Sequence, residues 1–161
     1  MLKIFYNLEP FFEDVYRELS VREYGRLKKV TAPTASKILK DLTEENLLIS
    51  SKKGIYLFFR ANRNYPLFRD LAVAYWREKL YHLFEKTHKE LFFKKIILFG
   101  STAKAENTID SDIDIFIDAG KKELDVRDIE KKLKRKIQFH FKESLRNPSL
   151  KKNIEMGILI R

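Results

Sequence analysis

The sequence of 161 residues has no cysteine, five glycines, four prolines and no long apolar run. Without cysteine, neither a disulfide framework nor a thiolate metal site is available. No uninterrupted apolar segment approaches the roughly 20 residues that a membrane-spanning helix needs, so we expect no membrane association. Acidic residues interrupt the apolar N-terminal run MLKIFYNLEPFFEDVYREL, which argues against a signal peptide. These absences favour a soluble, cytoplasmic protein.

Negative charge is also scarce. The chain has 33 lysines and arginines against 23 acidic residues, a formal net charge of +10, and its pI is about 9.6. A polyanion is therefore the expected partner. Charge alone is compatible with nucleic acid, nucleotide phosphates and an acidic membrane surface, and does not rank them. Against this background the run IDSDIDIFI (109–117) sets several aspartates in an apolar stretch. Two explanations are open: an acidic turn, or a divalent-metal site.

Helical patterns dominate the first part of the chain. Apolar spacing predicts a first helix over residues 9–19. Ser20, with Glu23 three residues later, predicts a reciprocal cap at the start of a short second helix. A further apolar stripe predicts a third helix that ends near Asn46, a residue type that accepts a left-handed backbone.

Two β-prone runs over residues 47–62 flank Gly54 and predict a hairpin. Three short helices followed by a basic hairpin resemble a winged helix-turn-helix domain, over about residues 1–65. The resemblance implies binding to double-stranded DNA, although the same fold also serves protein contacts and its lysines can simply face solvent. The residues implied to contact DNA are Thr34, Ser36, Lys37 and Lys40 on the third helix and Lys52 and Lys53 on the wing.

A long helical pattern without glycine runs over residues 66–89. Its apolar residues cover more than one face, so more than one packing partner must bury them. We interpret residues 66–92 as a connecting helix and a candidate homodimer surface. A single two-domain core without a dimer is the alternative.

A short apolar run over residues 95–99 predicts a buried strand, and Gly100-Ser101 follows it at the expected start of a helix. Such a turn suits an anion, because glycine lets the backbone approach and free amides face the ligand. In the next predicted strand Asp112 and Asp114 share one face, about 7 Å apart along the backbone, while the isoleucines between them face the core. Two carboxylates at this spacing can share Mg²⁺ or Mn²⁺.

Gly100-Ser101, a spacer and then Asp112-Ile113-Asp114 resemble the signature of the DNA polymerase beta-like nucleotidyltransferase superfamily in its minimal form. Ala105 stands where the family has a second glycine. The resemblance covers about residue 94 to the C-terminus. It implies a nucleoside triphosphate bound at Gly100, Ser101 and Lys104, a metal held by Asp112 and Asp114, and transfer of a nucleoside monophosphate to a hydroxyl with release of pyrophosphate.

The sequence departs from the family at its third carboxylate. Gln138, in the predicted strand KIQFHF (136–141), falls where the resemblance implies a catalytic acid. An amide cannot act as a base or offset charge. His140 shares the face of Gln138 and can accept a proton, whereas Glu143 lies just beyond the strand. Enzymatic activity is favoured by the motif and put in question by Gln138.

The basic run KKLKRK (131–136) ends a helical segment that begins near Val126. Most such runs are solvated helix ends, where cations suit the helix dipole. A nucleic-acid contact is the other interpretation.

Taken together, the patterns predict an α/β (α+β) protein: a winged helix over 1–65, a connecting helix over 66–92 and a small mixed-sheet nucleotidyltransferase fold over 93–161. Three functions remain open. The first is a Mg²⁺-dependent nucleotidyltransferase with a DNA-binding domain. The second is a DNA-binding transcriptional regulator whose nucleotidyltransferase-like domain senses nucleotide or dimerises. The third is an antitoxin-like partner of a toxin protein.

Overall fold

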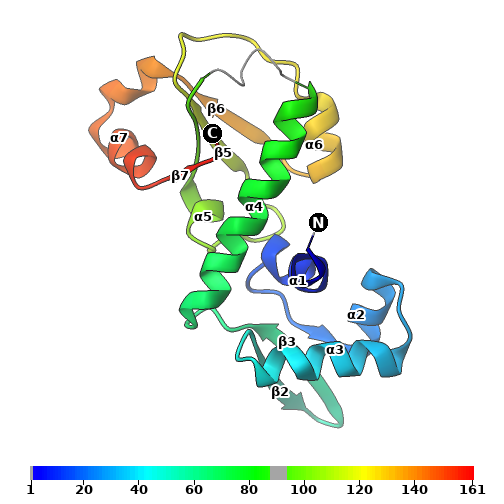
Figure 1. Cartoon of the computed structure of the whole chain (residues 1–161). Coiled ribbons are helices and arrows are strands. Elements are labelled where there is room, and N and C mark those ends of the chain that lie inside the picture. Colours follow the sequence, from blue (N-terminus) through cyan, green and yellow to red (C-terminus); the bar gives the residue numbers. More distant parts are fainter. Residues whose placement is uncertain (1, 88–93) are drawn as a thin grey trace. The chain divides into compact units, whose positions relative to one another are not determined.

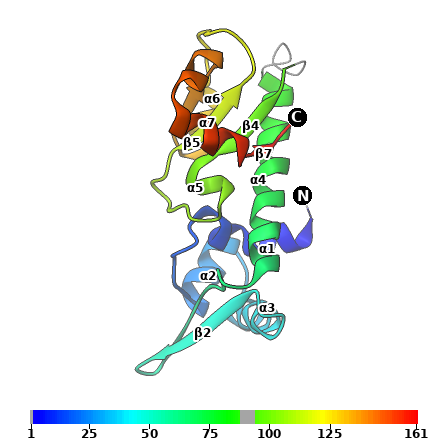
Figure 2. The ribbon, with the colours of Figure 1, turned by 90° about the vertical axis from the view of Figure 1, so that its left-hand side faces the viewer.

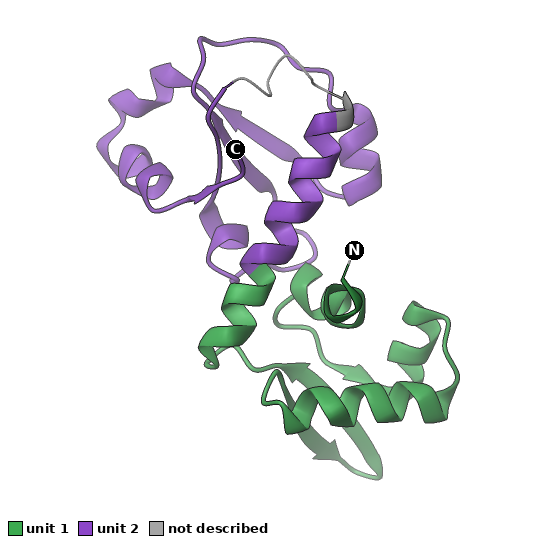
Figure 3. Cartoon of the chain, viewed as in Figure 1, with its two compact units in different colours: residues 1–72 green, residues 73–161 purple. Residues whose placement is uncertain are grey.

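The computed structural model describes residues 2–87 and 94–161 (Figure 1). The chain forms two compact units, Met1–Ala72 and Val73–Arg161 (Figure 3). Both units combine helices with a small sheet, which confirms the predicted mixed α/β class. Within the described residues, no helix has the length and apolar character needed to cross a membrane.

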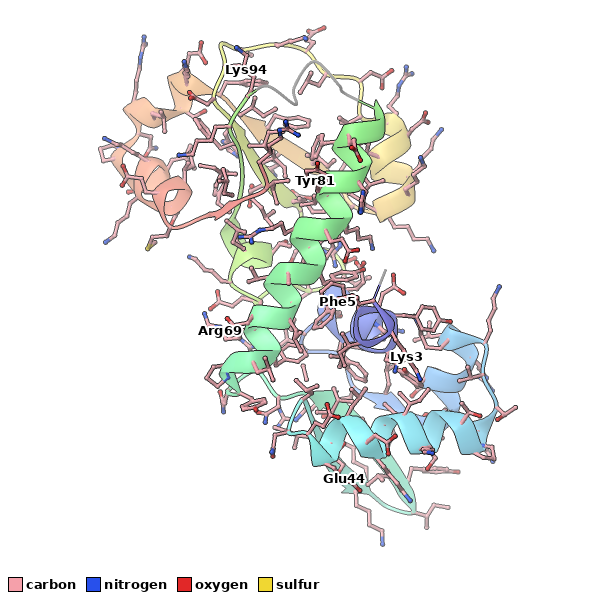
Figure 4. The ribbon with its side chains drawn as sticks, in the orientation of Figure 1. Lys3, Phe5, Glu44, Arg69, Tyr81 and Lys94 are labelled. Carbon is pink, nitrogen blue, oxygen red and sulfur yellow. The ribbon has the colours of Figure 1, made fainter. Side chains whose placement is uncertain are left out.

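The first unit contains three helices and a three-stranded antiparallel sheet. Its elements are α1 (Lys3–Glu13), β1 (Leu19–Ser20), α2 (Val21–Lys28), α3 (Ala32–Glu44), β2 (Leu48–Lys53) and β3 (Tyr56–Ala61), followed by the first residues of α4. The strand order is β1-β3-β2. Figure 4 draws the side chains, with Lys3 marking the start of α1 and Glu44 the end of α3. The predicted hairpin is confirmed, whereas the winged-helix resemblance stays a prediction.

Local signals in the sequence set the boundaries of these elements. Ser20 and Glu23 form the predicted capping box, in which the Glu23 carboxylate accepts from the Ser20 backbone amide at 2.8 Å. Asn46 has a left-handed backbone (φ 60°) after α3, as predicted. Gly54 is also left-handed (φ 61°) and closes the turn between β2 and β3.

The prediction for the first helix is wrong. The helix spans Lys3–Glu13 rather than 9–19, and Pro10 lies inside it. Proline removes one backbone hydrogen bond, which normally disfavours such a position. Here apolar burial outweighs that cost, because Phe5, Leu8, Phe11 and Phe12 are all buried on the helix.

Helix α4 (Pro66–Thr87) belongs to both units, because the boundary between them falls after Ala72. The predicted connecting helix begins at the same residue as α4, and residues 88–92 of that prediction lie outside the described residues. Several apolar side chains of α4 are buried by other parts of the same chain. Those buried in the first unit are Phe68 and Ala72, and those buried in the second are Tyr75, Trp76, Leu80 and Phe84. The homodimer stays a prediction.

The second unit is a four-stranded mixed sheet with helices. After the rest of α4, its elements are β4 (Ile96–Phe99), α5 (Gly100–Ala103), β5 (Ile113–Ile117), α6 (Arg127–Leu133), β6 (Ile137–His140), a 3-10 helix η2 (Lys142–Arg146), α7 (Pro148–Glu155) and β7 (Ile158–Leu159). The strand order is β6-β5-β4-β7, with β5 and β6 parallel and the other pairs antiparallel. The predicted small mixed sheet is confirmed.

The two faces of this sheet have different partners. Ile154 of α7 packs on Ile97, Phe99 and Phe116. On the other face, the ring of Phe84 of α4 lies 6.3 Å from the ring of Phe139. Figure 2 shows α7 and α4 on opposite sides of the strands. Because Asp114 lies two residues before Phe116 on β5, its side chain belongs to the α7 face.

Candidate active site

The site lies where β4 ends and β5 and β6 begin. Phe99, the last residue of β4, pairs with Asp114, and Asp114 pairs on its other side with Gln138. Asp112 directly precedes β5. The antiparallel and parallel pairings therefore bring the glycine turn, the two aspartates and Gln138 to one edge of the sheet, as the sequence predicts for this fold.

Gly100 is required by its contact with Asp114. Its backbone is left-handed (φ 76°), and an added Cβ atom would lie 3.2 Å from Asp114 Cγ and closer still to Oδ2. Any other residue would both strain the backbone and displace the carboxylate. Glycine thus brings the main chain directly against the second aspartate.

Gln138 acts as a donor in this site. Its Nε2 donates to Asp112 Oδ2 at 2.5 Å. The amide oxygen, a group that can ligate a cation weakly, is the other end of the same side chain. Gln138 therefore holds the first aspartate by a hydrogen bond to a charged acceptor, a contact that a carboxylate at this position would turn into a repulsion.

His140 lies beside the second aspartate. Its Nε2 is 3.6 Å from Asp114 Oδ1, and its ring packs edge-on against Phe99 with ring centroids 5.0 Å apart. Burial raises the pKa of Asp114, His140 opposes the rise, and the negative charge of Asp112 adds to it. The charged form of Asp114 is thus disfavoured, and a cation bound beside it would oppose this effect.

The segment after Gly100 forms one helical turn. Helix α5 has four residues, and Ser101 O accepts from the amides of Lys104 and Glu106 at 3.1 and 2.9 Å. Ala105, at the family's second glycine, has a left-handed backbone (φ 54°). The backbone thus keeps the conformation that favours glycine although the residue is alanine. Lys104 is exposed, and its role toward nucleotide stays a prediction.

No group of three or more acidic, histidine or cysteine side chains is arranged for a metal ion within residues 2–87 and 94–161. Glu143 is not brought to the site, because its Oε1 accepts from the backbone amide of Lys121, which follows the far end of β5. The site therefore consists of two carboxylates, an amide and an imidazole.

Sequence reasoning missed Arg135. This arginine is buried, its Nη1 donates to the backbone oxygen of Ser111 at 2.7 Å, and its guanidinium lies 5.5 Å from the centre of the Trp76 ring. It thereby fixes the residue that precedes Asp112. Within the run KKLKRK, nothing in the local pattern distinguishes this buried cation from its exposed neighbours.

The residues predicted to contact DNA lie on α3 and β2. Lys37, Lys40 and Lys52 are exposed. Two of the predicted residues have intramolecular contacts: the Thr34 hydroxyl is 2.9 Å from the Thr31 hydroxyl at the helix cap, and Lys53 forms an ion pair with Glu18. Ser36 is half-buried. DNA binding itself stays a prediction.

Comparison with known families supports the C-terminal assignment. Residues 82–160 match the family model described as the nucleotidyltransferase domain. The match covers β4 to β7 and every residue of the site. It does not reach residues 1–81. No curated protein and no solved structure was found to match the chain.

Proposed function

We propose that the protein transfers a nucleoside monophosphate from a nucleoside triphosphate to a hydroxyl group. One observation carries the proposal: Gly100 holds the main chain directly against Asp114, in a domain that matches the nucleotidyltransferase family. The absence of a side chain at Gly100 lets the main chain lie against the Asp114 carboxylate, so phosphate oxygens at this turn would lie beside two carboxylates.

The donor set fits Mg²⁺ or Mn²⁺. Both cations prefer oxygen ligands, and Mg²⁺ commonly takes one or two carboxylates together with substrate phosphates and water. Asp112 and Asp114 would hold the metal. A bound cation supplies charge neutralisation and alignment of the attacking and leaving oxygens.

The remaining residues have separable roles in this proposal. Gln138 orients Asp112 through its hydrogen bond. His140 takes the place of the missing third carboxylate as the group that accepts the hydroxyl proton, because an amide cannot do so. The acceptor oxygen forms a bond to the α-phosphorus, the bond to the bridging oxygen breaks, and pyrophosphate leaves with that electron pair.

The N-terminal unit would bind DNA and so place the nucleotidyltransferase domain near it. Its exposed lysines on α3 and β2 and its antiparallel hairpin suit contacts to phosphates. Lys52 is the stronger candidate on the hairpin, since Lys53 is engaged by Glu18.

A second function has its own supporting observation. Gln138 donates to Asp112 and leaves the site with two carboxylates, which favours a DNA-binding regulator that binds nucleotide with little or no turnover.

Nucleotidyl transfer is tested by incubating the protein with each α-phosphate-labelled triphosphate and Mg²⁺, followed by mass spectrometry of protein and nucleic-acid products. We expect labelled product with the natural protein, none with Asp112→Asn, and undiminished product with Asp110→Asn, which changes an exposed neighbouring acid. Nucleotide binding without product would favour the regulator, and product from Asp112→Asn would contradict the proposed site.

A further inference from the structure

A basic cavity lies at the C-terminal end of α6. It has a volume of about 410 Å³ and is lined by Arg127, Glu130, Lys131, Lys134, Arg135 and Lys136. Helix α6 ends at Leu133, and Lys134 has a left-handed backbone (φ 54°), so the chain turns sharply at this point. The turn brings cations of the helix and of the segment that precedes β6 around one cavity.

Glu130, which lines this cavity, and Asp125, which lies beside Arg127, already have partners within the chain. Glu130 Oε1 accepts from the Ile137 amide at 2.9 Å, and its Oε2 lies 3.7 Å from Lys136. Arg127 is paired with Asp125 at 2.6 Å. Lys131 and Lys134 are exposed and form no ion pair with any part of the chain that the structure describes. Lys131 and Lys134 thus provide two uncompensated positive charges in the cavity, next to Arg127 and Lys136, which already pair with acidic residues.

Hydrogen bonds link the cavity to the candidate active site. Arg135 reaches from the cavity to the backbone oxygen of Ser111, and the backbone oxygen of Lys136 accepts from the Ile113 amide at 2.9 Å. Asp112 lies between these two anchored residues. The cavity and the carboxylate pair therefore occupy the same edge of the sheet in the second unit.

The lining chemistry identifies the kind of ligand. All six residues are charged, five of them cationic, and none is aromatic. Such a surface binds backbone phosphates without reading sequence. We propose that this cavity binds the phosphate backbone of a nucleic-acid strand and makes a nucleic-acid hydroxyl the acceptor of the transferred nucleotide. The second clause rests on the proposed function.

Binding is measured by fluorescence anisotropy of the full-length protein with labelled single-stranded RNA and DNA, in EDTA and over a series of NaCl concentrations. Replacing Lys131 and Lys134 together by Ala should weaken binding and make the slope of log K against log salt shallower by about 1.4, or about 0.7 for each single-strand phosphate that the protein no longer neutralises. The matched control replaces Lys121 and Lys122, two exposed lysines outside the cavity, and removes the same charge.

Ultraviolet cross-linking with peptide mapping then locates the strand. Cross-links within residues 127–136 support the proposal, and the RNA and DNA arms identify which nucleic acid is preferred. Equal effects of the two double variants, or cross-links confined to the N-terminal unit, would overturn it.

Failure of the proposed function has a different signature. Suppose that the strand binds at 127–136 but the protein binds no triphosphate with Mg²⁺. Nucleic-acid binding by the cavity is then supported, whereas the enzymatic function and the acceptor role of the nucleic acid are both rejected. If labelled nucleotide is transferred only to protein or to a small molecule, the enzymatic function is supported and nucleic acid is rejected as the acceptor.

Discussion

Replacing Gln138 by Glu tests the hydrogen bond that distinguishes this site from one with three carboxylates. The substitution keeps the shape of the side chain but places a carboxylate where Nε2 now donates to Asp112 Oδ2 at 2.5 Å. We expect the variant to be less stable than the natural protein without metal, because a favourable contact becomes a repulsion between like charges.

The size of the effect follows from the exposure of the site. A hydrogen bond to a charged group contributes about 1.5–3 kcal/mol when it is well shielded, and Gln138 is exposed, so the lower end of this range applies. Solvent also weakens the new repulsion. A destabilisation of roughly 1–2 kcal/mol corresponds to a fall in melting temperature of about 2–8 °C in a chain of this size.

A neutral control separates the two contributions. Gln138→Met removes the donor without adding charge, so its stability reports the removal of the hydrogen bond alone. The extra instability of the Glu variant should shrink at acidic pH, where its carboxylates are protonated, and in Mg²⁺, which binds the folded state more tightly than the unfolded state. Thermal melts at several pH values, with and without Mg²⁺, measure both effects. Equal stability of the Glu and Met variants under all these conditions would refute the contact between Gln138 and Asp112.

Three further sets of substitutions test Asp114, the left-handed Ala105 and the lysines of the hairpin. Asp114→Asn should raise the melting temperature without metal at neutral pH. Burial raises the pKa of Asp114, so the charged carboxylate costs stability above that pKa, and the gain in melting temperature should fade as the pH falls through the folded-state pKa. Ala105→Gly should stabilise the protein by up to about 1 kcal/mol in denaturant melts, because it removes the strain of an alanine with a left-handed backbone, whereas Ala103→Gly within the helical turn should destabilise it. The reverse order of stabilities would contradict the backbone assignment. Replacing Lys52 and Lys53 by Ala should weaken binding to all DNA duplexes alike and reduce the salt slope by up to about 0.9 for each phosphate that is no longer neutralised, with the smaller share from Lys53; unchanged binding would remove the hairpin from the DNA interface.

The carboxylate pair and the glycine turn could be predicted from sequence because their signals are local. Alternation along a strand fixes the face of Asp114, and a glycine between a strand and a helix marks a close approach of the backbone. The cap at Ser20 and the helix stop at Asn46 were predictable for the same reason.

The parts that could not be predicted depend on tertiary contacts. Local propensity argues against a helix through Pro10, and burial of aromatic residues overrides it. The burial of Arg135 follows from its contacts with Ser111 and Trp76, which lie far away in sequence. Likewise, sequence shows that Gln138 replaces an acid, but only the pairing of β5 with β6 shows that its amide donates to Asp112.

Calorimetric titration of nucleoside triphosphate into the protein, with Mg²⁺ and again with EDTA, tests the central claim most directly: Asp112, Asp114 and Gly100 form a metal-dependent nucleotide site. We expect binding with Mg²⁺, much weaker binding with EDTA, and a loss of the Mg²⁺ dependence in Asp112→Asn and Asp114→Asn but not in Asp110→Asn. Equal nucleotide binding in Mg²⁺ and EDTA, or binding that survives both site substitutions unchanged, would contradict this claim.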